Sequence, residues 1–372
     1  MHRGAIAEID LDAIAHNFSL VREMTGNRPV IAVVKADAYG HGAVEVSKRL
    51  VEKGVSCLAV AFTEEGIALR ESGISSPILV FFDTGATADF FEHHLIPVLH
   101  DLETARRLYG ESLRRGRSLD VHVKLDTGLG RIGFYDDREL ETLNVITASG
   151  LLRIVGLMSH FSEADIADTA YAKAQLTMFH AMKEKVLQGG KGTVMCHIAN
   201  SAAIMSLREA HLDAVRPGLM LYGYSPLTGA SLRPSSLKPS MRVTTQILSL
   251  KRFRKGMSVS YGRTFITRRE SLIAVLPLGY ADGIGRVFSN NLEVLVKGKR
   301  VPVAGRICMD LTMVDITEVG EVAVGDEVVL IGKQGDEEIS AGELAEKAGT
   351  INYEILTTIG MRSRRVYRGQ GL

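Results

Sequence analysis

Short apolar runs alternate with amphipathic stretches between residues 29 and 223, and this alternation constrains the fold more than any other feature of the sequence. Most runs are continuously apolar, which is typical of strands buried on both faces of a parallel sheet. The stretches between them, such as residues 63–71 and 170–188, are long enough for crossover helices. The runs are residues 29–35, 57–62, 77–82, 95–100, 119–125, 154–160, 193–198 and 214–222.

Strands in regular alternation with helices most simply close into a (β/α)8 barrel of the TIM type, so we expect an α/β N-terminal domain with this fold. A doubly wound open sheet is the alternative. That fold normally begins with a glycine-rich first turn, and the sequence offers none.

The pattern changes around residues 227–239, a stretch bearing Pro, Ser and Gly that we interpret as a linker. Strand-like runs separated by turn signals follow it at residues 244–251, 271–277, 301–306, 311–316 and 328–331, with one helix-like stretch at 341–348. We therefore expect a barrel domain over residues 1–236, whose first ten residues could instead pair with the second domain, and a mostly β domain over residues 237–372.

Charge and cysteine content exclude several classes of protein. Lys and Arg number 44 against 43 for Asp and Glu, so the strong basic field that supports nucleic-acid binding is missing. No apolar run is long enough to span a bilayer, and the first residues lack a signal-peptide pattern. Cys57, Cys196 and Cys308 are too few and too scattered for a disulfide framework or a metal site. We expect a cytoplasmic protein that binds no nucleic acid, membrane or metal.

Lys35 is the most informative polar residue because it ends the first apolar run. Reactive groups in such barrels gather at the C-terminal ends of the strands. A lysine among apolar groups loses its proton more easily, which favours reaction with an aldehyde. A lysine that only extends from the rim into solvent fits this position equally well.

Later strand ends carry cationic or imidazole side chains, namely Lys124, Arg131, His160, His197 and Arg216. One buried histidine is more often a core residue than a catalyst, and one arginine can simply form an ion pair. Several such groups at one barrel mouth instead favour an anionic ligand, and a phosphorylated aromatic cofactor has the right chemistry.

Residues 33–42, Val-Val-Lys-Ala-Asp-Ala-Tyr-Gly-His-Gly, resemble the pyridoxal-phosphate attachment motif of bacterial alanine racemases. The resemblance continues in order through residues 124–133, 197–202, 216–223, 259–262, 278–283, 306–310 and 351–354. It implies a pyridoxal 5'-phosphate-dependent isomerase that interconverts L- and D-alanine and supplies D-alanine for peptidoglycan. It also implies a homodimer with composite active sites.

The resemblance assigns two catalytic bases. Lys35 holds the cofactor and acts on the D-alanine face, whereas Tyr261 of the partner subunit acts on the L-alanine face. Two bases are needed because a proton leaves one face of Cα and another arrives on the opposite face. A tyrosine hydroxyl is a weak acid, and the resemblance suggests that His160, His197 and Arg216 assist it.

The remaining roles also follow from the resemblance alone. Arg216 faces the pyridine nitrogen, where a guanidinium donates a hydrogen bond but not readily a proton. The other cofactor contacts are His160 and Asn200, with Tyr39, Ser201, Tyr353 and the main chain of Gly218 and Leu219 at the phosphate. Arg131 and the Met309 main-chain N–H bind the substrate carboxylate, and Lys124, His197, Tyr280 and Asp310 are supporting residues. Lys124 matches a lysine that can be carbamylated in the family, which would relieve its repulsion from Arg131.

Two other functions share parts of this pattern. A pyridoxal-phosphate decarboxylase of the same fold type would share the lysine, the barrel and the β domain. Its Gly-rich phosphate loop and Glu-Pro-Gly-Arg segment are absent from the sequence. A non-enzymatic pyridoxal-phosphate carrier would consist of the barrel alone and would have no use for Tyr261 and Met309. Strictness for alanine over serine is left open by the sequence, because one added group changes binding by only about 1–3 kcal/mol.

Overall fold

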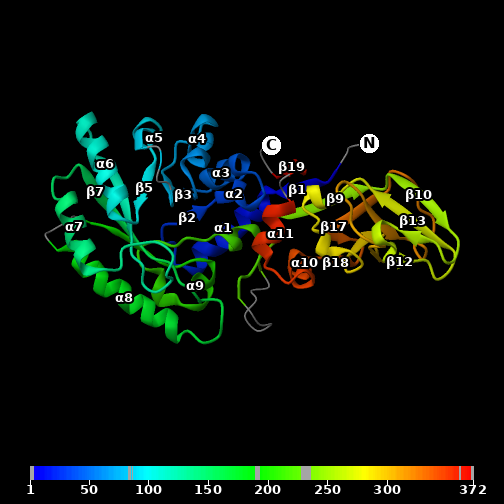
Figure 1. The fold of residues 1–372 in the computed structure, drawn as a ribbon. Helices are drawn as coiled ribbons and strands as arrows, with labels where there is room; N and C mark the ends of the chain where they lie inside the picture. The colour runs from blue at the N-terminus through cyan, green and yellow to red at the C-terminus, as the bar shows by residue number, and fades with distance from the viewer. Residues whose placement is uncertain are drawn as a thin grey trace. The chain divides into compact units, whose positions relative to one another are not determined.

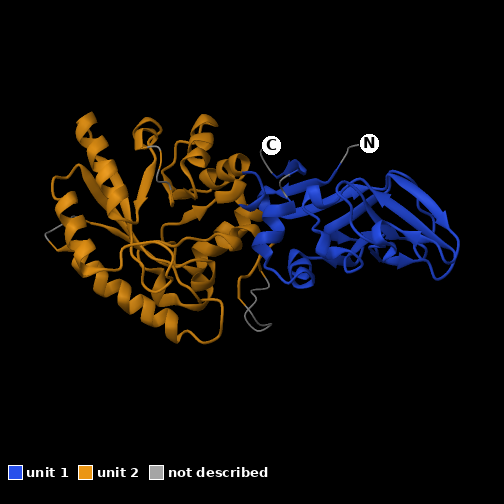
Figure 2. Cartoon of the chain, in the orientation of Figure 1, with its two compact units in different colours: residues 1–12, 39–42, 239–372 blue, residues 13–38, 43–238 orange. Residues whose placement is uncertain are grey.

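The computed structural model describes residues 4–82, 85, 87–188, 193–227, 236–359 and 362–369. The chain forms two compact units (Figure 2). The barrel unit comprises residues 13–38 and 43–238, and the β unit comprises residues 1–12, 39–42 and 239–372. Most of the predicted linker, residues 228–235, lies outside the described residues.

A seven-stranded parallel sheet forms the centre of the barrel unit, in the order β2-β3-β4-β5-β6-β7-β8 (Figure 1). Its strands are β2 (Ile31–Val33), β3 (Cys57–Val60), β4 (Ile78–Val80), β5 (Ile96–Leu99), β6 (Leu119–Lys124), β7 (Leu152–Met158) and β8 (Met195–His197). Most of their residues are buried, as the continuous apolar runs predict.

The sheet closes through a short irregular segment in place of a regular eighth strand. Val30 and Val215 form a parallel bridge, and the Ile31 N–H donates to the Val215 carbonyl over 2.9 Å. On the other side, the Arg216 N–H donates to the Ala199 carbonyl over 2.8 Å. Pro217 has no N–H to continue the ladder, and the chain then turns into η2 (Leu219–Tyr222). The predicted barrel is confirmed, with its last strand reduced to this closing segment.

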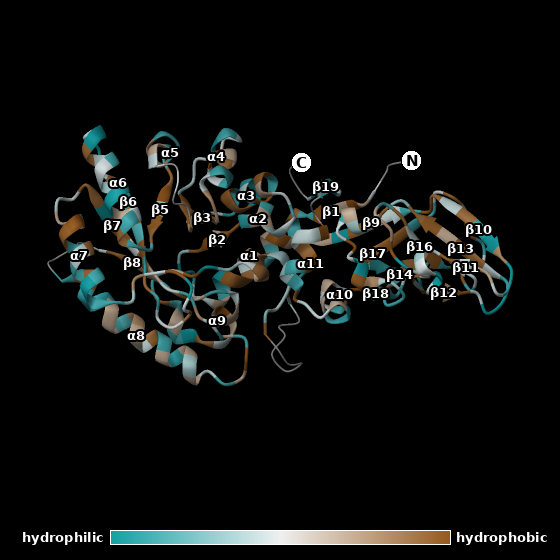
Figure 3. Cartoon of the chain, viewed as in Figure 1, coloured by the Kyte–Doolittle hydropathy of each residue, from teal (hydrophilic) through white to brown (hydrophobic). Residues whose placement is uncertain are grey.

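Helices surround this sheet: α1 (Leu11–Met24), α3 (Ala43–Glu52), α4 (Thr63–Glu71), α5 (Thr87–Glu92), α6 (Leu102–Arg115), α7 (Asp137–Thr147), α8 (Ala170–Leu187) and α9 (Ser201–Ser206). Figure 3 shows hydrophobic and hydrophilic residues alternating along α7 and α8, as expected of helices with one buried face. None of the helices in the described ranges has the length and apolar character needed to cross a membrane.

The β unit is mostly strands, which confirms the predicted fold class. Its larger sheet has the order β15-β14-β17-β9-β1-β19, and β18 pairs with β17. A smaller sheet has the order β10-β13-β16, and β11 and β12 form a two-stranded sheet. The strands are β1 (Ile6–Asp10), β9 (Met241–Gln246), β10 (Ser249–Phe253), β11 (Ser258–Val259), β12 (Phe265–Ile266), β13 (Ser271–Leu276), β14 (Glu293–Val296), β15 (Lys299–Pro302), β16 (Thr312–Asp315), β17 (Glu327–Gln334), β18 (Glu337–Ile339) and β19 (Arg364–Arg368).

Two helices, α10 (Ala341–Ala348) and α11 (Asn352–Ile359), complete the β unit. Residues 39–42 contact α11 and β19 closely. A Cβ on Gly40 would lie 2.3 Å from the Leu356 carbonyl oxygen, and one on Gly42 would lie 1.9 Å from the Tyr367 hydroxyl. The Arg365 Nε also donates to the Gly40 carbonyl over 2.9 Å. Both glycines have positive φ, so only glycine satisfies the steric and the backbone requirement together.

Tyr222 provides a test of barrel closure, because its fully buried hydroxyl donates to the Val33 carbonyl of β2 over 2.9 Å. Tyr222→Phe should lower the free energy of unfolding by about 1–2 kcal/mol, since a buried hydrogen bond is lost without a large change in shape. A urea titration monitored by circular dichroism measures the change. Tyr135→Phe, at a side chain that is 73% exposed, is the matched control and should leave stability unchanged. Equal stabilities for both variants would show that this bond does not hold the closing segment.

Candidate active site

Lys35 lies two residues after the end of β2 and begins α2 (Lys35–Tyr39), a turn of left-handed backbone. Ala36, Asp37, Ala38 and Tyr39 all have φ between 51° and 55°. Left-handed conformations cost non-glycine residues about 1–2 kcal/mol each, so the surrounding structure must hold the turn in place. The sequence predicted a strand through Lys35, whereas β2 ends at Val33 and the lysine lies in this strained turn.

The Lys35 amine lies in a cationic region. Its Nζ is 5.6 Å from the centre of the Phe82 ring, and the Arg131 guanidinium carbon is 5.8 Å from the same centre. Burial lowers the pKa of Lys35, Arg131 lowers it further, and Glu65 partly opposes them. Lys35 therefore has a larger neutral fraction than an exposed lysine, as a nucleophilic amine requires.

Lys124 ends β6 and is buried. Burial, together with the positive charges of Arg131 and Arg216, lowers the pKa of Lys124 to about 8. An unmodified Lys124 thus has an appreciable neutral fraction near neutral pH.

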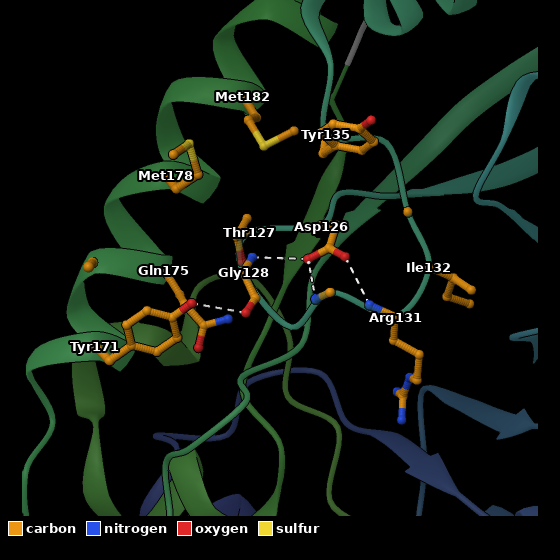
Figure 4. A pocket seen from close by; sticks show the side chains of 13 residues that line it. Asp126, Thr127, Gly128, Arg131, Ile132, Tyr135, Tyr171, Gln175, Met178 and Met182 are labelled. Carbon is orange, nitrogen blue, oxygen red and sulfur yellow. Dashed lines mark hydrogen bonds between the residues drawn. The ribbon is translucent and has the colours of Figure 1, made fainter.

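The loop after β6 is shaped by the Asp126 carboxylate (Figure 4). It accepts main-chain N–H bonds from Gly128 at 2.9 Å, Gly130 at 3.1 Å and Arg131 at 3.1 Å. Burial alone would raise the pKa of Asp126, but these donors outweigh it and lower the pKa. Figure 4 shows the Arg131 side chain extending away from this carboxylate, so its guanidinium is left for other partners.

Arg216 lies in the closing segment and is almost completely buried. It donates to the carbonyl oxygens of His197 at 2.6 Å, Ser159 at 2.5 Å and Ile198 at 3.3 Å, and contacts the His160 Nδ1 at 3.4 Å. Burial lowers the pKa of Arg216 to about 9, so the side chain stays protonated at neutral pH. Within the described part of the chain, Arg216 makes no ion pair with a carboxylate.

A chain of two buried histidines continues from Arg216. The Arg216 Nη1 lies 2.7 Å from the His197 Nδ1, and the His197 Nε2 lies 2.8 Å from the His122 Nδ1. Arginine only donates, so His197 accepts at Nδ1 and carries its proton on Nε2, which donates to His122. Burial and the Arg216 charge lower the pKa of His122 to about 3 and that of His197 well below its ordinary range. Both rings are therefore neutral, and their tautomers are fixed by Arg216.

His122 reaches His197 because of an irregularity in β7. The β6–β7 pairing shifts register between Val121 and His122, so that His122 pairs with Gly156 and Val155 is the extra residue. A Cβ on Gly156 would lie 2.3 Å from the His122 Nδ1. Gly156 thus provides the space in which the imidazole lies.

Two of the predicted phosphate-binding segments, those of Ser201 and of Gly218 and Leu219, meet at α9. Asn200 caps this helix by accepting from the Ala203 N–H at 3.0 Å. The buried Ser201 hydroxyl accepts from the main-chain N–H of Gly218 at 2.9 Å and of Met220 at 3.3 Å. The structure therefore brings Ser201 together with Gly218 and places Leu219 immediately beside them, at the start of η2.

The β unit contains the other predicted residues. The rings of Tyr39 and Tyr353 are 5.8 Å apart. Burial, followed by the neighbouring Tyr353, raises the pKa of Tyr39, which keeps its hydroxyl protonated as a hydrogen-bond donor.

Tyr261 begins η4 (Tyr261–Arg263), between β11 and β12, and its side chain is 68% exposed. The preceding Ser260 donates to the Arg306 carbonyl, and the Tyr280 N–H of η5 (Tyr280–Asp282) donates to the Cys308 carbonyl over 3.0 Å. These bonds gather the Tyr261, Tyr280 and Met309 segments on one part of the unit. Asp310 lies next to Met309 and pairs with Arg362 at 3.7 Å.

Several residues of this site were not predicted from the sequence. Glu65, Phe82 and Gly156 had no assigned role, and His122 lay within the fifth apolar run, residues 119–125, without one. His122 lies two residues before Lys124 in β6, so both side chains point to the same face of the strand. This spacing could have indicated that His122 belongs to the site. In the described ranges, no group of three or more His, Cys, Asp and Glu side chains could hold a metal ion.

A barrel with a cationic mouth is typical of an enzyme that binds an anionic ligand. The family model described as alanine racemase, N-terminal domain, matches residues 9–226, and the model described as alanine racemase, C-terminal domain, matches residues 240–367. The chain belongs to the alanine racemase family, and its activity is that of an isomerase that interconverts L- and D-alanine.

Individual relatives agree with this assignment. The chain is 48% identical to the alanine racemase of Thermodesulfovibrio yellowstonii over 371 residues, covering 99% of this chain and 98% of the relative. It is similar to the structure of alanine racemase from Bacillus anthracis with bound L-Ala-P, with a TM-score of 0.93, 36% identity and coverage of 100% and 97%. The structure from Bartonella henselae with covalently bound pyridoxal phosphate has a TM-score of 0.89, 30% identity and coverage of 99% and 100%. The decarboxylase and carrier interpretations are set aside by these matches.

The histidine chain can be tested through Gly156. Gly156→Ala should displace the His122 ring, break its bond to His197 and cost about 1–3 kcal/mol of stability, as overpacked buried sites do. Nitrogen-15 NMR of the imidazoles should show the loss of the fixed His122 tautomer, because His197 no longer donates to it, whereas Arg216 still fixes the tautomer of His197. Gly110→Ala, in α6 with no atom within 4 Å of the new Cβ, is the control and should not be destabilised. An unchanged His122 tautomer in Gly156→Ala would contradict the proposed chain of donors.

Proposed function

We propose that this chain racemises alanine by a two-base mechanism in which Lys35 and Tyr261 act on opposite faces of the substrate Cα. The observation that carries the proposal is the barrel mouth, where a lysine of lowered pKa lies among Lys124, Arg131 and the buried Arg216. Two bases are required because inversion removes a proton from one face and adds one to the other.

The barrel residues fit pyridoxal 5'-phosphate, the cofactor of this family. A partly neutral lysine suits an aldehyde, and an excess of positive charge suits a phosphate. When bound, the cofactor supplies a conjugated ring that withdraws electrons from the bonds to the substrate Cα. The residues that would hold it are Lys35 at the aldehyde, Arg216 at the ring nitrogen, His160 and Asn200 beside it, and Tyr39, Ser201, Tyr353 and the Gly218 and Leu219 main chain at the phosphate.

Proton movement then involves this chain's own side chains. In the direction from L- to D-alanine, Tyr261 as its phenolate would remove the Cα proton and Lys35 as its ammonium would deliver a proton to the opposite face, leaving Tyr261 protonated and Lys35 neutral. The reverse reaction exchanges these roles. Arg216 remains protonated throughout, and His160 and His197 stay neutral because burial holds their pKa values well below the ordinary range.

The substrate carboxylate would bind Arg131 and the Met309 main-chain N–H, with Tyr280 and Asp310 supporting the Met309 segment. Carbamylation of Lys124 is supported by its charge environment. Burial, Arg131 and Arg216 all disfavour its protonated form, and a neutral amine is the form that reacts with carbon dioxide. A carbamate there would be an anion beside Arg131 and would remove the repulsion between the two side chains.

The active form would be a homodimer in which Tyr261 and Met309 complete the barrel mouth of the partner subunit. Support comes from exposure, because Tyr261, Tyr280 and Met309 are 68%, 42% and 54% exposed in this chain. Large apolar side chains gathered at a surface are typical of an interface. A two-fold axis would then create two equivalent sites.

The wider context is also proposed. The product would supply D-alanine for peptidoglycan. A cytoplasmic location is supported by three free cysteines, Cys57, Cys196 and Cys308. The boundary between a barrel domain, residues 1–236, and a β domain, residues 237–372, remains a prediction.

Tyr261→Phe tests the assignment of the two faces. Removal of the Cα hydrogen from L-alanine should fall by about 10²–10⁴-fold, the usual contribution of a positioned base, because phenylalanine cannot accept the proton. Removal from D-alanine should be much less affected, since Lys35 is intact. Solvent deuterium incorporation, measured for each enantiomer separately by mass spectrometry, gives both rates. Equal losses for the two enantiomers would show that Tyr261 is not specific for one face.

Mixing two inactive variants tests the composite site. Lys35→Ala and Tyr261→Phe homodimers should each lack full racemisation, because every site has one lesion. A heterodimer would contain one site with both lesions and one intact site. Random pairing of symmetric chains should restore about one quarter of wild-type activity, since half of the dimers are mixed and each has one good site of two. Isolated heterodimers without activity would place Lys35 and Tyr261 of the same chain in one site.

A further inference from the structure

The left-handed turn after Lys35 is held by a side chain from another element. Ala36, its first left-handed residue, donates its main-chain N–H to the Glu65 Oε1 over 2.6 Å. Glu65 lies in the first turn of α4, which follows the neighbouring strand β3. The bond therefore joins the chain segments that follow two adjacent barrel strands.

Both oxygens of the Glu65 carboxylate are used. Oε2 accepts the N–H of Ala61 at 2.7 Å and of Phe62 at 3.2 Å, which is the ordinary function of a glutamate in the first turn of a helix. Capping of α4 needs only this one oxygen. The bond from Oε1 to Ala36 lies outside the capping pattern and needs a separate explanation.

Glu65 also acts on the Lys35 amine through its charge. Two charged side chains shift the pKa of Lys35: Arg131, from the loop after β6, and Glu65, from α4. Lys124, at the end of β6, repels Lys35 as well. The neighbouring His160 is neutral, and Asp37 is engaged with the Ala43 N–H at 2.7 Å. Burial and Arg131 lower the pKa of Lys35, while Glu65 raises it.

We propose that Glu65 is a positioning residue that holds the left-handed turn and thereby presents the Lys35 amine to the cofactor aldehyde and to the substrate Cα. The inference rests on the proposed function of Lys35. Four consecutive left-handed residues without glycine are costly, and the carboxylate holds the first of them. The turn is further held by the Ala38 N–H, which donates over 2.8 Å to the carbonyl of Val34, the residue that follows β2.

Three variants of the full-length protein separate the functions of this carboxylate. Glu65→Gln has the same shape, but its NH2 group cannot accept. Its one remaining oxygen faces two N–H donors at Ala61 and Phe62 against one at Ala36, so Ala36 is the group that loses its acceptor. Glu65→Asp keeps the charge but is one methylene shorter, so it cannot span both partners. Glu64→Gln removes an adjacent, exposed charge from the same helical turn and is the matched control.

The first measurement is hydrogen exchange by mass spectrometry on the cofactor-free protein. Exchange in a peptide covering residues 34–42 should be at least about tenfold faster in Glu65→Gln and Glu65→Asp than in wild type or Glu64→Gln, because the Ala36 N–H loses its acceptor. Acceleration confined to residues 61–71 would show that Glu65 only caps α4 and would overturn the proposal.

The second measurement is the rate at which added pyridoxal phosphate forms the visible absorption band of the lysine-bound cofactor, followed against pH. Both Glu65 variants should react about tenfold more slowly at the optimum, because the amine is no longer held in position. In Glu65→Gln alone, the pH midpoint should also shift downward, since removing the anion further lowers the pKa of Lys35. Rates and midpoints equal to wild type in both variants would overturn the proposal. If wild type itself never attaches the cofactor at Lys35, the proposed function fails, whereas the exchange result still decides whether Glu65 holds the turn.

Discussion

The buried guanidinium of Arg216 is the constraint on which the rest of the barrel mouth depends. A buried cation is costly unless its donors are satisfied, and Arg216 is satisfied by the carbonyls of Ser159, His197 and Ile198 and by the His197 imidazole instead of by a carboxylate. These acceptors come from the ends of β7 and β8, while Arg216 itself lies in the segment that closes the barrel on β2. The same short segment therefore closes the barrel and positions the Arg216 guanidinium, so a change that disturbs the closure would also displace the cation.

This unneutralised charge also determines the behaviour of its neighbours. Arg216 contributes to lowering the pKa of Lys124, His122, His160 and His197, while Arg131 contributes at Lys35. The result is a site with neutral imidazoles and with lysines that lose their protons easily. Such a collection of charges gains stability from an anion, which agrees with a phosphorylated cofactor and with a carbamate on Lys124. Reactivity of the lysine and affinity for the anion thus have a common electrostatic origin.

The sequence predicted those parts of the molecule that depend on repeating patterns or on local motifs. The barrel strands and helices α4 and α10 follow from apolar periodicity, and the cationic residues were recognised because they end those strands. The left-handed turn could not be foreseen, because Ala-Asp-Ala-Tyr has none of the glycines that normally indicate positive φ. The bond from Glu65 to Ala36 joins residues 29 positions apart, and the register shift at His122 depends on how β6 and β7 pair. Short polar strands such as β18 were missed because Glu337–Ile339 contains no alternation to detect.

The direction of the hydrogen bonds decides what the Arg216 network can do. Because a guanidinium only donates, Arg216 fixes His197 as an acceptor at Nδ1, and His197 must then donate from Nε2 to His122. The chain of donors therefore runs away from the barrel mouth, and neither neutral imidazole can pass a proton back toward Arg216. In the proposed site, the ring nitrogen of the cofactor would face a donor that keeps its proton, at a pKa of about 9. The ring would then accept less negative charge than one paired with a carboxylate, which leaves protonation at Cα by the two bases as the favoured outcome. In the proposed site, this weaker withdrawal of electrons would limit side reactions such as transamination.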